Sequence, residues 1–222
     1  LRFVGRLVGK GSSLPGQYAL KICPDVLGRV KLPPTIIAVT GSNGKTSTVE
    51  MIAAILRKSG RTVLYNAEGS NQIEGVATLI LCGSTLGGKV RGDVLLLESD
   101  ERYARRSFRF FRPTHFVITN LYRDQLTRNG HPEWVYDAIK PAIHPETALV
   151  LNADDPLVSC FARDHEKVSW FGLDRCSIST PDHHGVYHDG SLCPVCGGVM
   201  EYAFYHYEHI GSYHCPGCGY RR

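Results

Sequence analysis

Two groups of residues in this sequence have the types and the spacing that chemistry requires. The first is the run T-G-S-N-G-K-T from Thr40 to Thr46, which separates an apolar, β-branched segment from a segment with helical spacing. Glycines let a loop wrap around a phosphate without side-chain clashes, and the helix that follows offers free N–H groups. This strand–loop–helix context predicts a nucleotide site rather than a glycine-rich turn with a chance lysine.

The residues of this loop have separate expected roles. Lys45 is expected to reach the β- and γ-phosphates, and the hydroxyl of Thr46 is expected to bind Mg²⁺. The loop departs from the strict G-x-x-x-x-G-K-[ST] pattern, because Val39 occupies the first glycine position. The predicted nucleotide-binding residues are Thr40, Gly41, Ser42, Asn43, Gly44, Lys45, Thr46 and Ser47.

The second group is a pair of C-P-x-C motifs near the end of the sequence. Between the Cys193–Cys196 pair and the Cys215–Cys218 pair lie 18 residues, a spacing typical of zinc sites. Four thiolates complete a tetrahedral shell and leave no open position, so we predict that these four cysteines bind a structural Zn²⁺. Two redox dithiols or disulfides are the weaker alternative at this spacing.

The residues between the two motifs indicate a zinc ribbon. Residues 201–207 are rich in strand formers, and Gly211 with Ser212 is expected to form the turn before the second strand. The other cysteines, at positions 23, 82, 160 and 176, have no metal-binding spacing. We therefore predict a small separate unit over residues 193–222.

The elements that would position these groups follow from the hydrophobic pattern. Between residues 35 and 172, strand-like runs alternate with helix-like runs, which predicts an α/β fold: a mostly parallel, P-loop-type sheet with helices on both faces. The predicted strands are residues 35–39, 62–65, 94–97, 115–119, 148–151 and 167–171. The predicted helices are residues 46–59, 71–82, 100–110, 132–140 and 156–164.

Acidic residues follow several of these strands. Glu98 ends a predicted buried strand, at the sheet edge where open parallel sheets hold ligands, and we predict it as a Mg²⁺ ligand and, with Lys45, a catalytic residue. A helix cap is the alternative role, which suits Asp100 better. Asp124 fits a magnesium shell or a cap equally well. Asp155 precedes a proline, which favours helix entry.

Composition limits the remaining possibilities. A net charge of +4, spread along the chain, allows an anionic ligand and does not indicate nucleic acid. No apolar run is long enough for a transmembrane helix, and residues 1–10, a possible amphipathic helix, lack the features of a signal peptide, so we expect a cytoplasmic location. Both ends suggest a fragment. The predicted parts are an N-terminal segment 1–34, an ATP-binding domain 35–173, a linker 174–192 and the ribbon 193–222.

Several motifs, in order, resemble the Mur ligase family. The loop at residues 40–47 is similar to the ATP loop of Mur ligases and folylpolyglutamate synthetases, which form amide bonds through an acyl phosphate. Residues 97–101, 119–126 and 151–156 resemble the family's magnesium-binding glutamate, T-N-x-x-x-D-H-L and N-A-D-D segments. Gln125 stands where the family usually has a metal-binding histidine, which puts a second metal site in doubt. This glutamine and the four-cysteine ribbon resemble the family's lipid II-amidating branch.

This resemblance implies a specific activity. It implies a ligase with ATP, Mg²⁺ and structural Zn²⁺ that converts the D-glutamate α-carboxylate of the lipid II stem peptide to D-isoglutamine through an acyl phosphate. Ammonia would come from a GatD-type glutamine amidotransferase subunit, at the inner membrane surface and without nucleic acid. Adenine contacts would lie in a missing C-terminal part. The alternatives are another Mur or folylpolyglutamate-type amide ligase, or a zinc-ribbon binding module.

Overall fold

The computed structural model describes residues 13–66, 72–123, 131–185 and 187–222. The predictions for residues 1–10, Asp124 and Gln125 lie outside these ranges. Among the described residues, no helix combines the length and the apolar character that crossing a bilayer requires.

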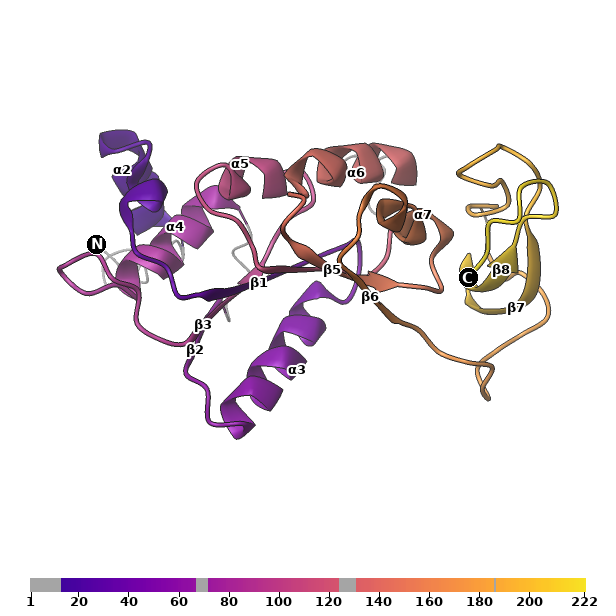
Figure 1. Cartoon of the computed structure of the whole chain (residues 1–222), viewed down its shortest axis with the longest axis horizontal. Coiled ribbons are helices and arrows are strands. Elements are labelled where there is room, and N and C mark those ends of the chain that lie inside the picture. Colours follow the sequence, from indigo (N-terminus) through magenta and orange to yellow (C-terminus); the bar gives the residue numbers. More distant parts are fainter. Residues whose placement is uncertain (1–12, 67–71, 124–130, 186) are drawn as a thin grey trace.

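Six parallel strands form the central sheet, in the order β2-β3-β1-β4-β5-β6 (Figure 1). The predicted mostly parallel sheet is therefore confirmed, and each strand lies within about a residue of its predicted bounds. The strands are β1 (Thr35–Thr40), β2 (Val63–Tyr65), β3 (Val94–Glu98), β4 (His115–Ile118), β5 (Ala148–Asn152) and β6 (Val168–Phe171).

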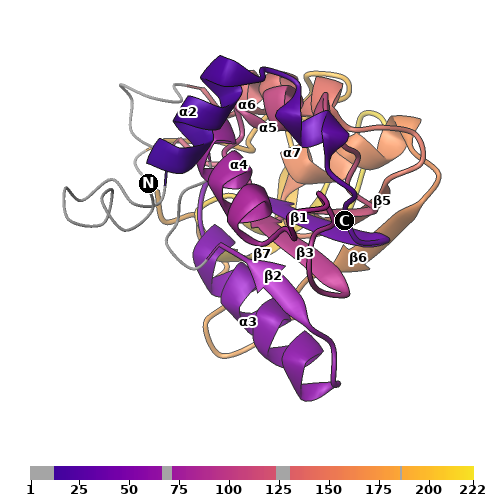
Figure 2. The same ribbon diagram turned by 90° about the vertical axis from the view of Figure 1, so that its left-hand side faces the viewer.

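Helices cover both faces of this sheet, unequally. One face carries α3 (Lys45–Lys58), which among the described helices is the one on that side of the sheet (Figure 2). The opposite face carries the α-helices α2 (Leu14–Ile22), α4 (Ile73–Cys82), α5 (Ala104–Phe108), α6 (Pro132–Ile139) and α7 (Pro156–Ser159), and the 3₁₀ turns are η1 (Val26–Arg29), η3 (Lys140–Ala142) and η4 (Cys160–Asp164).

The strand β3 shows why the sheet needs two helical layers. Its side chains alternate between the faces: Leu95 and Leu97 join the core beneath α4 and α5, whereas Leu96 joins the core beneath α3. All five residues of β3 are buried. A strand that is apolar on both faces is typical of the interior of a parallel sheet, as the sequence predicted.

The helix α2 lies in the predicted N-terminal segment and was not predicted. A proline is tolerated in the first turn of a helix, where its missing N–H has no helical partner. Gly16 lets α2 approach α4 closely, and its N–H donates to Thr78 Oγ1 at 2.8 Å. The buried Leu27 of η1 belongs to the main core, and Leu20 and Leu32, on either side of η1, pack against that core.

Two predicted helices are shorter than expected. In the segment predicted to be helical from residue 100, Asp100 forms a turn instead: its Oδ1 accepts the N–H of Arg102 and its carbonyl accepts that of Tyr103, so α5 begins at Ala104. The helix predicted over residues 156–164 is α-helical only to Ser159 and continues as a 3₁₀ turn.

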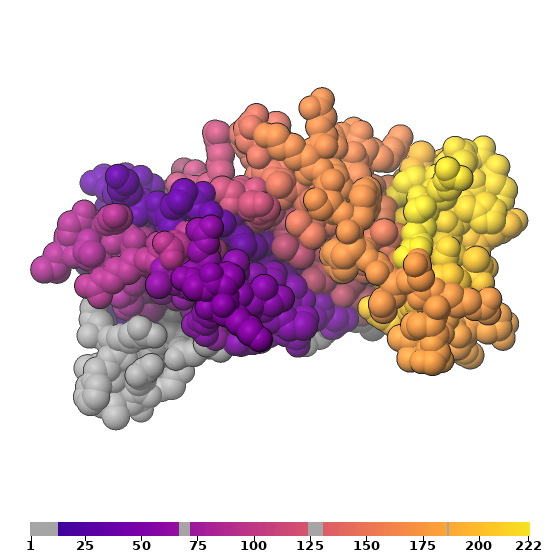
Figure 3. All heavy atoms as spheres, turned by 60° about the horizontal axis from the view of Figure 1, so that its bottom comes forward, coloured from indigo at the N-terminus to yellow at the C-terminus, as the bar shows by residue number. Residues whose placement is uncertain are grey.

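The C-terminal unit is a two-stranded antiparallel ribbon of β7 (Glu201–Tyr207) and β8 (Ile210–His214). The predicted turn at Gly211 and Ser212 is wrong, because the turn lies at Glu208 and His209, with Glu208 at φ 44°. Gly211 lies within β8, where a Cβ would approach Phe204 O to 2.2 Å. The glycine therefore permits close strand pairing rather than a turn. Figure 3 shows the ribbon, in yellow, packed against the rest of the chain.

Candidate functional site

The loop from Gly41 to Gly44 joins β1 to α3 at the carboxyl edge of the sheet. The segment after β4 forms hydrogen bonds to the backbone of this loop. Asn120 O accepts the N–H of Ser42 at 2.8 Å, and Asn120 Oδ1 accepts the N–H of Asn43 at 2.9 Å. The hydroxyl of Thr119 donates to Asn43 O at 2.8 Å. Two loop amides are therefore used to fix the loop, and the first-turn amides of α3 remain free of helical acceptors.

Gly41 and Gly44 of the loop exclude a side chain for different physical reasons. Gly41 has φ +129°, and a Cβ there would lie 2.2 Å from Thr119 Oγ1 and 2.9 Å from Asn120 O. Gly44 has φ +79°, and a Cβ there would meet no atom within 4 Å. The backbone of Gly41 is pressed against the β4 segment, whereas Gly44 is constrained only by its conformation, just before α3 begins.

We expect Gly41→Ala to destabilise the full-length protein by about 2–4 kcal/mol, because the Cβ combines a steric clash with an unfavourable φ. Gly44→Ala is the matched control and should cost only about 1 kcal/mol, for the conformation alone. Urea unfolding of both variants measures the difference. Equal losses would show that Gly41 is not held against Thr119 and Asn120.

The side chain of Lys45 folds back over the loop. Its Nζ donates to Gly41 O at 2.5 Å, to Ser42 O at 3.2 Å and to Glu101 Oε1 at 2.8 Å. The side chain of Glu101 is only 3% exposed, and burial raises the pKa of its carboxyl while the charge of Lys45 lowers it. The lysine charge is thus held at the centre of the loop, where an anionic ligand can replace the carbonyl contacts.

Thr46 and Glu98 meet at the same edge. The Thr46 hydroxyl, in the first turn of α3, donates to Glu98 Oε2 at 2.8 Å from the end of β3. Glu98 is buried, at 4% exposed, and Val39 of β1 is its register partner. A hydroxyl and a carboxylate oxygen at hydrogen-bonding distance are the donors that Mg²⁺ prefers, so the pair fits such an ion.

The structure places the predicted loop residues together with Glu98, but sequence reasoning missed three of the groups that hold them. Asn120, Tyr122 and Glu101 contact the loop or its lysine, although each lies at least 56 positions from its partner. The T-N pair was visible after a predicted strand. These two residues, Thr119 and Asn120, are called the strap because they hold the loop. This contact could not be inferred from the sequence, because it depends on β4 being the neighbour of β1.

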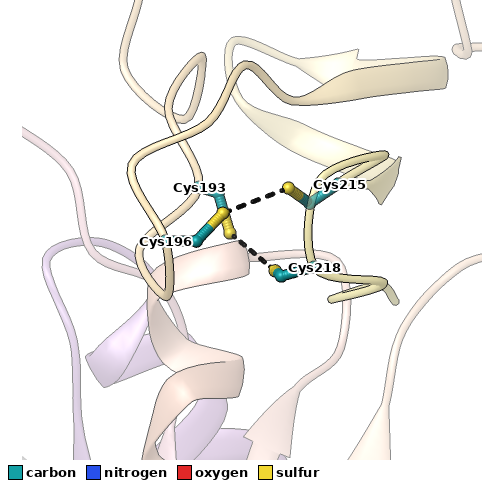
Figure 4. Close-up of side chains that lie close together, drawn as sticks. All are labelled: Cys193, Cys196, Cys215 and Cys218. Carbon is teal, nitrogen blue, oxygen red and sulfur yellow. Dashed lines mark hydrogen bonds between the residues drawn. The ribbon is translucent and has the colours of Figure 1, made fainter.

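The four cysteines form one cluster (Figure 4). Cys193 Sγ lies 3.6 Å from Cys218 Sγ, Cys196 Sγ lies 3.6 Å from Cys215 Sγ, and all four sulfur atoms lie within 4.8 Å of one another. Four sulfurs bound tetrahedrally at the Zn–S distance would be about 3.8 Å apart. A disulfide needs sulfur atoms about 2 Å apart, so the cluster fits a bound metal ion rather than two bridges.

The ribbon is attached to the sheet through the two aspartates that follow β5. Asp155 Oδ1 caps α7 by accepting the amides of Leu157 and Val158, so the helix-entry interpretation of this residue is confirmed. Its other oxygen lies 3.5 Å from His209 Nε2 of the ribbon. Asp154 accepts a hydrogen bond from the guanidinium of Arg222 at 2.5 Å.

The charges of His209 and Asp155 favour the attachment of the ribbon to the sheet. His209 is 3% exposed, and burial favours its neutral ring, but the hydrogen bond and the charge of Asp155, with Asp189 and Glu208 nearby, raise its pKa overall. This contribution to stability is present below the ordinary histidine pKa of 6.5 and is lost as pH rises through the raised value.

A chain of contacts runs from the ribbon to the loop of residues 41–44, which is called the phosphate loop below after its predicted ligand. The ring of Tyr122 stacks on Tyr207 with centroids 5.9 Å apart and lies 4.7 Å from the ring of His209. The backbone of Tyr122 contacts the loop, since its N–H donates to Ser42 Oγ at 2.8 Å and its carbonyl accepts that hydroxyl at 3.2 Å. Asp155 joins the same path by accepting the N–H of Leu121 at 2.8 Å.

Comparisons with known proteins agree with this site. A subunit MurT of the lipid II isoglutaminyl synthase (glutamine-hydrolyzing) from Streptococcus pneumoniae is 36% identical over 99% of this chain and 49% of its own length. Its counterpart from Staphylococcus aureus is 32% identical over 100% of this chain and 50% of its own. A solved structure, the pseudomurein peptide ligase type C from Methanothermus fervidus, has a TM-score of 0.66 and 27% identity, covering 88% of this chain and 38% of that one.

The chain spans about half the length of these two relatives. The family described as the Mur ligase middle domain matches residues 39–192, from the end of β1 to the residue before the cysteine cluster. This match contains the phosphate loop, Glu98, the strap after β4 and the aspartates that seat the ribbon. Because the match covers well over half of the sequence, the chain belongs to the Mur ligase family through its middle domain.

Proposed function

We propose that this chain is the nucleotide-binding part of an ATP-dependent ligase that amidates a carboxylate. The observation that carries the proposal is the loop of residues 41–44, strapped in a fixed shape with the charge of Lys45 at its centre. Residues 40–47 would bind ATP, with phosphate oxygens on the amides at the start of α3 and on Lys45. Thr46 and Glu98 would hold Mg²⁺, which would neutralise charge on the phosphates.

The substrate proposal is more specific. Two relatives that match nearly the whole chain are named as subunits of a lipid II isoglutaminyl synthase, which supports lipid II as the substrate. In the proposed reaction, a D-glutamate α-carboxylate oxygen attacks the γ-phosphorus of ATP and ADP leaves. Ammonia then attacks the acyl phosphate carbon and releases inorganic phosphate, which leaves D-isoglutamine. Lys45 and the loop amides would stabilise charge on the transferring phosphoryl group.

The partners and the ribbon metal follow from the same proposal. Since the relatives are called glutamine-hydrolyzing and subunits, a glutaminase partner of the GatD type would release the ammonia, and the reaction would take place at the inner face of the membrane. The four-cysteine cluster would hold Zn²⁺, which prefers tetrahedral thiolate ligands. With all four positions taken by cysteine, this ion would supply structure and no chemistry.

Mass spectrometry of the lipid II stem peptide tests the proposal. The full-length protein is incubated with ATP, Mg²⁺ and ammonium, and we expect the glutamate carboxylate to become an amide only when ATP is present. A second candidate, a peptide ligase, is favoured by the likeness to the pseudomurein peptide ligase. Addition of an amino acid in place of ammonia, with no amide formed from ammonium, would select that candidate and reject the amidation proposal.

A further inference from the structure

A cleft lined by arginines lies at the amino edge of the sheet, opposite the phosphate loop. It has a volume of about 600 Å³. It lies between α5, with the residues that follow α5, and η3, with the residues that follow η3. Arg105, Arg106, Arg109 and Arg112 line one side, and His144 lies on the other, among prolines and apolar side chains. No aspartate or glutamate is among the lining residues, so the charge that the cleft carries is positive.

The charged residues of the sequence around this cleft are nearly all of one sign. Residues 102–123 contain six arginines and no aspartate or glutamate. The prediction that positive charge is spread along the chain is therefore wrong for this segment. The net charge of +4 does not reveal this segment, because acidic residues elsewhere in the sequence balance its positive charge. The spacing of Arg105, Arg109 and Arg112 along a helical and then turning backbone places three guanidinium groups on one cleft.

The charges in the cleft are not neutralised from within the chain. Within the part of the chain that the structure describes, none of these four arginines makes an ion pair, although Arg106 lies over the ring of Tyr103 and Arg109 over that of Phe110. The two nearest acidic residues in the sequence have other partners: Asp100 contacts Arg102, and Glu101 is buried against Lys45. Like charges held together without counter-charges destabilise a fold, so an external anion would relieve them.

We propose that this cleft is a docking surface for the headgroups of anionic phospholipids. The guanidinium fork matches the oxygens of a phosphate group, and exposed arginines above apolar and prolyl residues suit the boundary between headgroups and glycerol. These arginines are exposed rather than enclosed, which favours a charged surface over a pocket that surrounds a free ion.

The position of the cleft suits the proposed function, on which this choice of ligand rests. The cleft occupies the edge of the sheet where β4 and β5 begin, whereas the phosphate loop lies where the strands end. A strand of five residues, such as β3, is about 17 Å long. Docking by the amino edge therefore leaves the phosphate loop open to solvent, about one strand length from the docked edge.

Vesicle binding tests the proposal without requiring any catalytic activity. The full-length protein is sedimented with phosphatidylcholine vesicles that contain or lack phosphatidylglycerol. We expect binding only to the anionic vesicles, and we expect the triple variant Arg105→Gln/Arg109→Gln/Arg112→Gln to bind about a hundredfold more weakly. Its matched control, Arg57→Gln/Lys58→Gln/Arg61→Gln, removes three exposed charges near the end of α3 and should bind as the wild type does.

Each other outcome overturns the proposal. Equal losses in the two triple variants would mean that net charge alone drives binding. Saturable binding of inorganic pyrophosphate that the Arg105/Arg109/Arg112 variant loses, without vesicle binding, would assign the cleft to a free phosphate ligand. Binding of an oligonucleotide that this variant loses, without vesicle binding, would assign the cleft to nucleic acid. The Arg105/Arg109/Arg112 variant should still amidate a soluble, lipid-free substrate. Vesicle binding can therefore fail while amidation succeeds, and the two proposals are tested separately.

Discussion

The full-length protein with Lys45→Ala is expected to lose at least about a thousandfold of its ATP-dependent amidation rate, because the charge that would stabilise the transferring phosphoryl group is removed. Lys45 Nζ is held by two loop carbonyls and Glu101 rather than being free in solvent, so its charge has a fixed position over the loop. The rate of amide formation on lipid II at saturating ATP, followed by mass spectrometry, measures this loss.

Two controls separate this effect from a loss of folding. Lys58→Ala removes an exposed lysine at the other end of α3 and should leave the rate unchanged. Lys45→Ala alone leaves the buried Glu101 carboxylate without its cation, which raises the pKa of that carboxyl further and destabilises the protein. Lys45→Ala/Glu101→Gln removes this unpaired charge. If the double variant is stable and still amidates at the wild-type rate, Lys45 is not part of the catalytic site.

The interior of the sheet could be predicted from the sequence because its interior strand β3 is buried on both faces. Val94 to Leu97 is apolar at every position, and such a short run is typical of an interior strand of a parallel sheet. The cysteine cluster could also be predicted, since two pairs of cysteines at this spacing are typical of a shared metal site. In both cases the signal is local or depends only on spacing.

The groups that stabilise the phosphate loop could not be predicted in the same way. Asn120 binds the loop only because β4 lies beside β1, with Thr40 opposite Ile118, and strand order is not encoded in any short motif. His209 contacts Asp155 for a similar reason: the ribbon folds back on the end of β5. An expectation drawn from pattern alone therefore finds the loop and misses the contacts that hold its shape.

The second large effect concerns the metal ion proposed for the four-cysteine cluster. Cys215→Ser in the full-length protein is expected to abolish metal binding at the cluster and to unfold the ribbon, because the binding free energy of a structural metal is also folding free energy. We also expect the affinity for ATP to fall about tenfold. Loss of the ribbon removes the rings that cover Tyr122, which is 7% exposed and whose backbone holds Ser42 of the loop.

Metal content per chain and the dissociation constant of ATP are measured on the same samples. Cys82→Ser is the matched control, since Cys82 is an exposed thiol outside the cluster, and both quantities should stay at their wild-type values. His209→Gln separates folding of the ribbon from its contact with the sheet: it leaves the cysteines intact but removes the imidazole that faces Asp155. If the ribbon and the phosphate loop are coupled through this contact, the variant keeps its metal and still binds ATP more weakly. If ATP affinity survives both the loss of the metal and His209→Gln, the ribbon folds on the sheet without influencing the phosphate loop, and the path through Tyr122 carries no coupling.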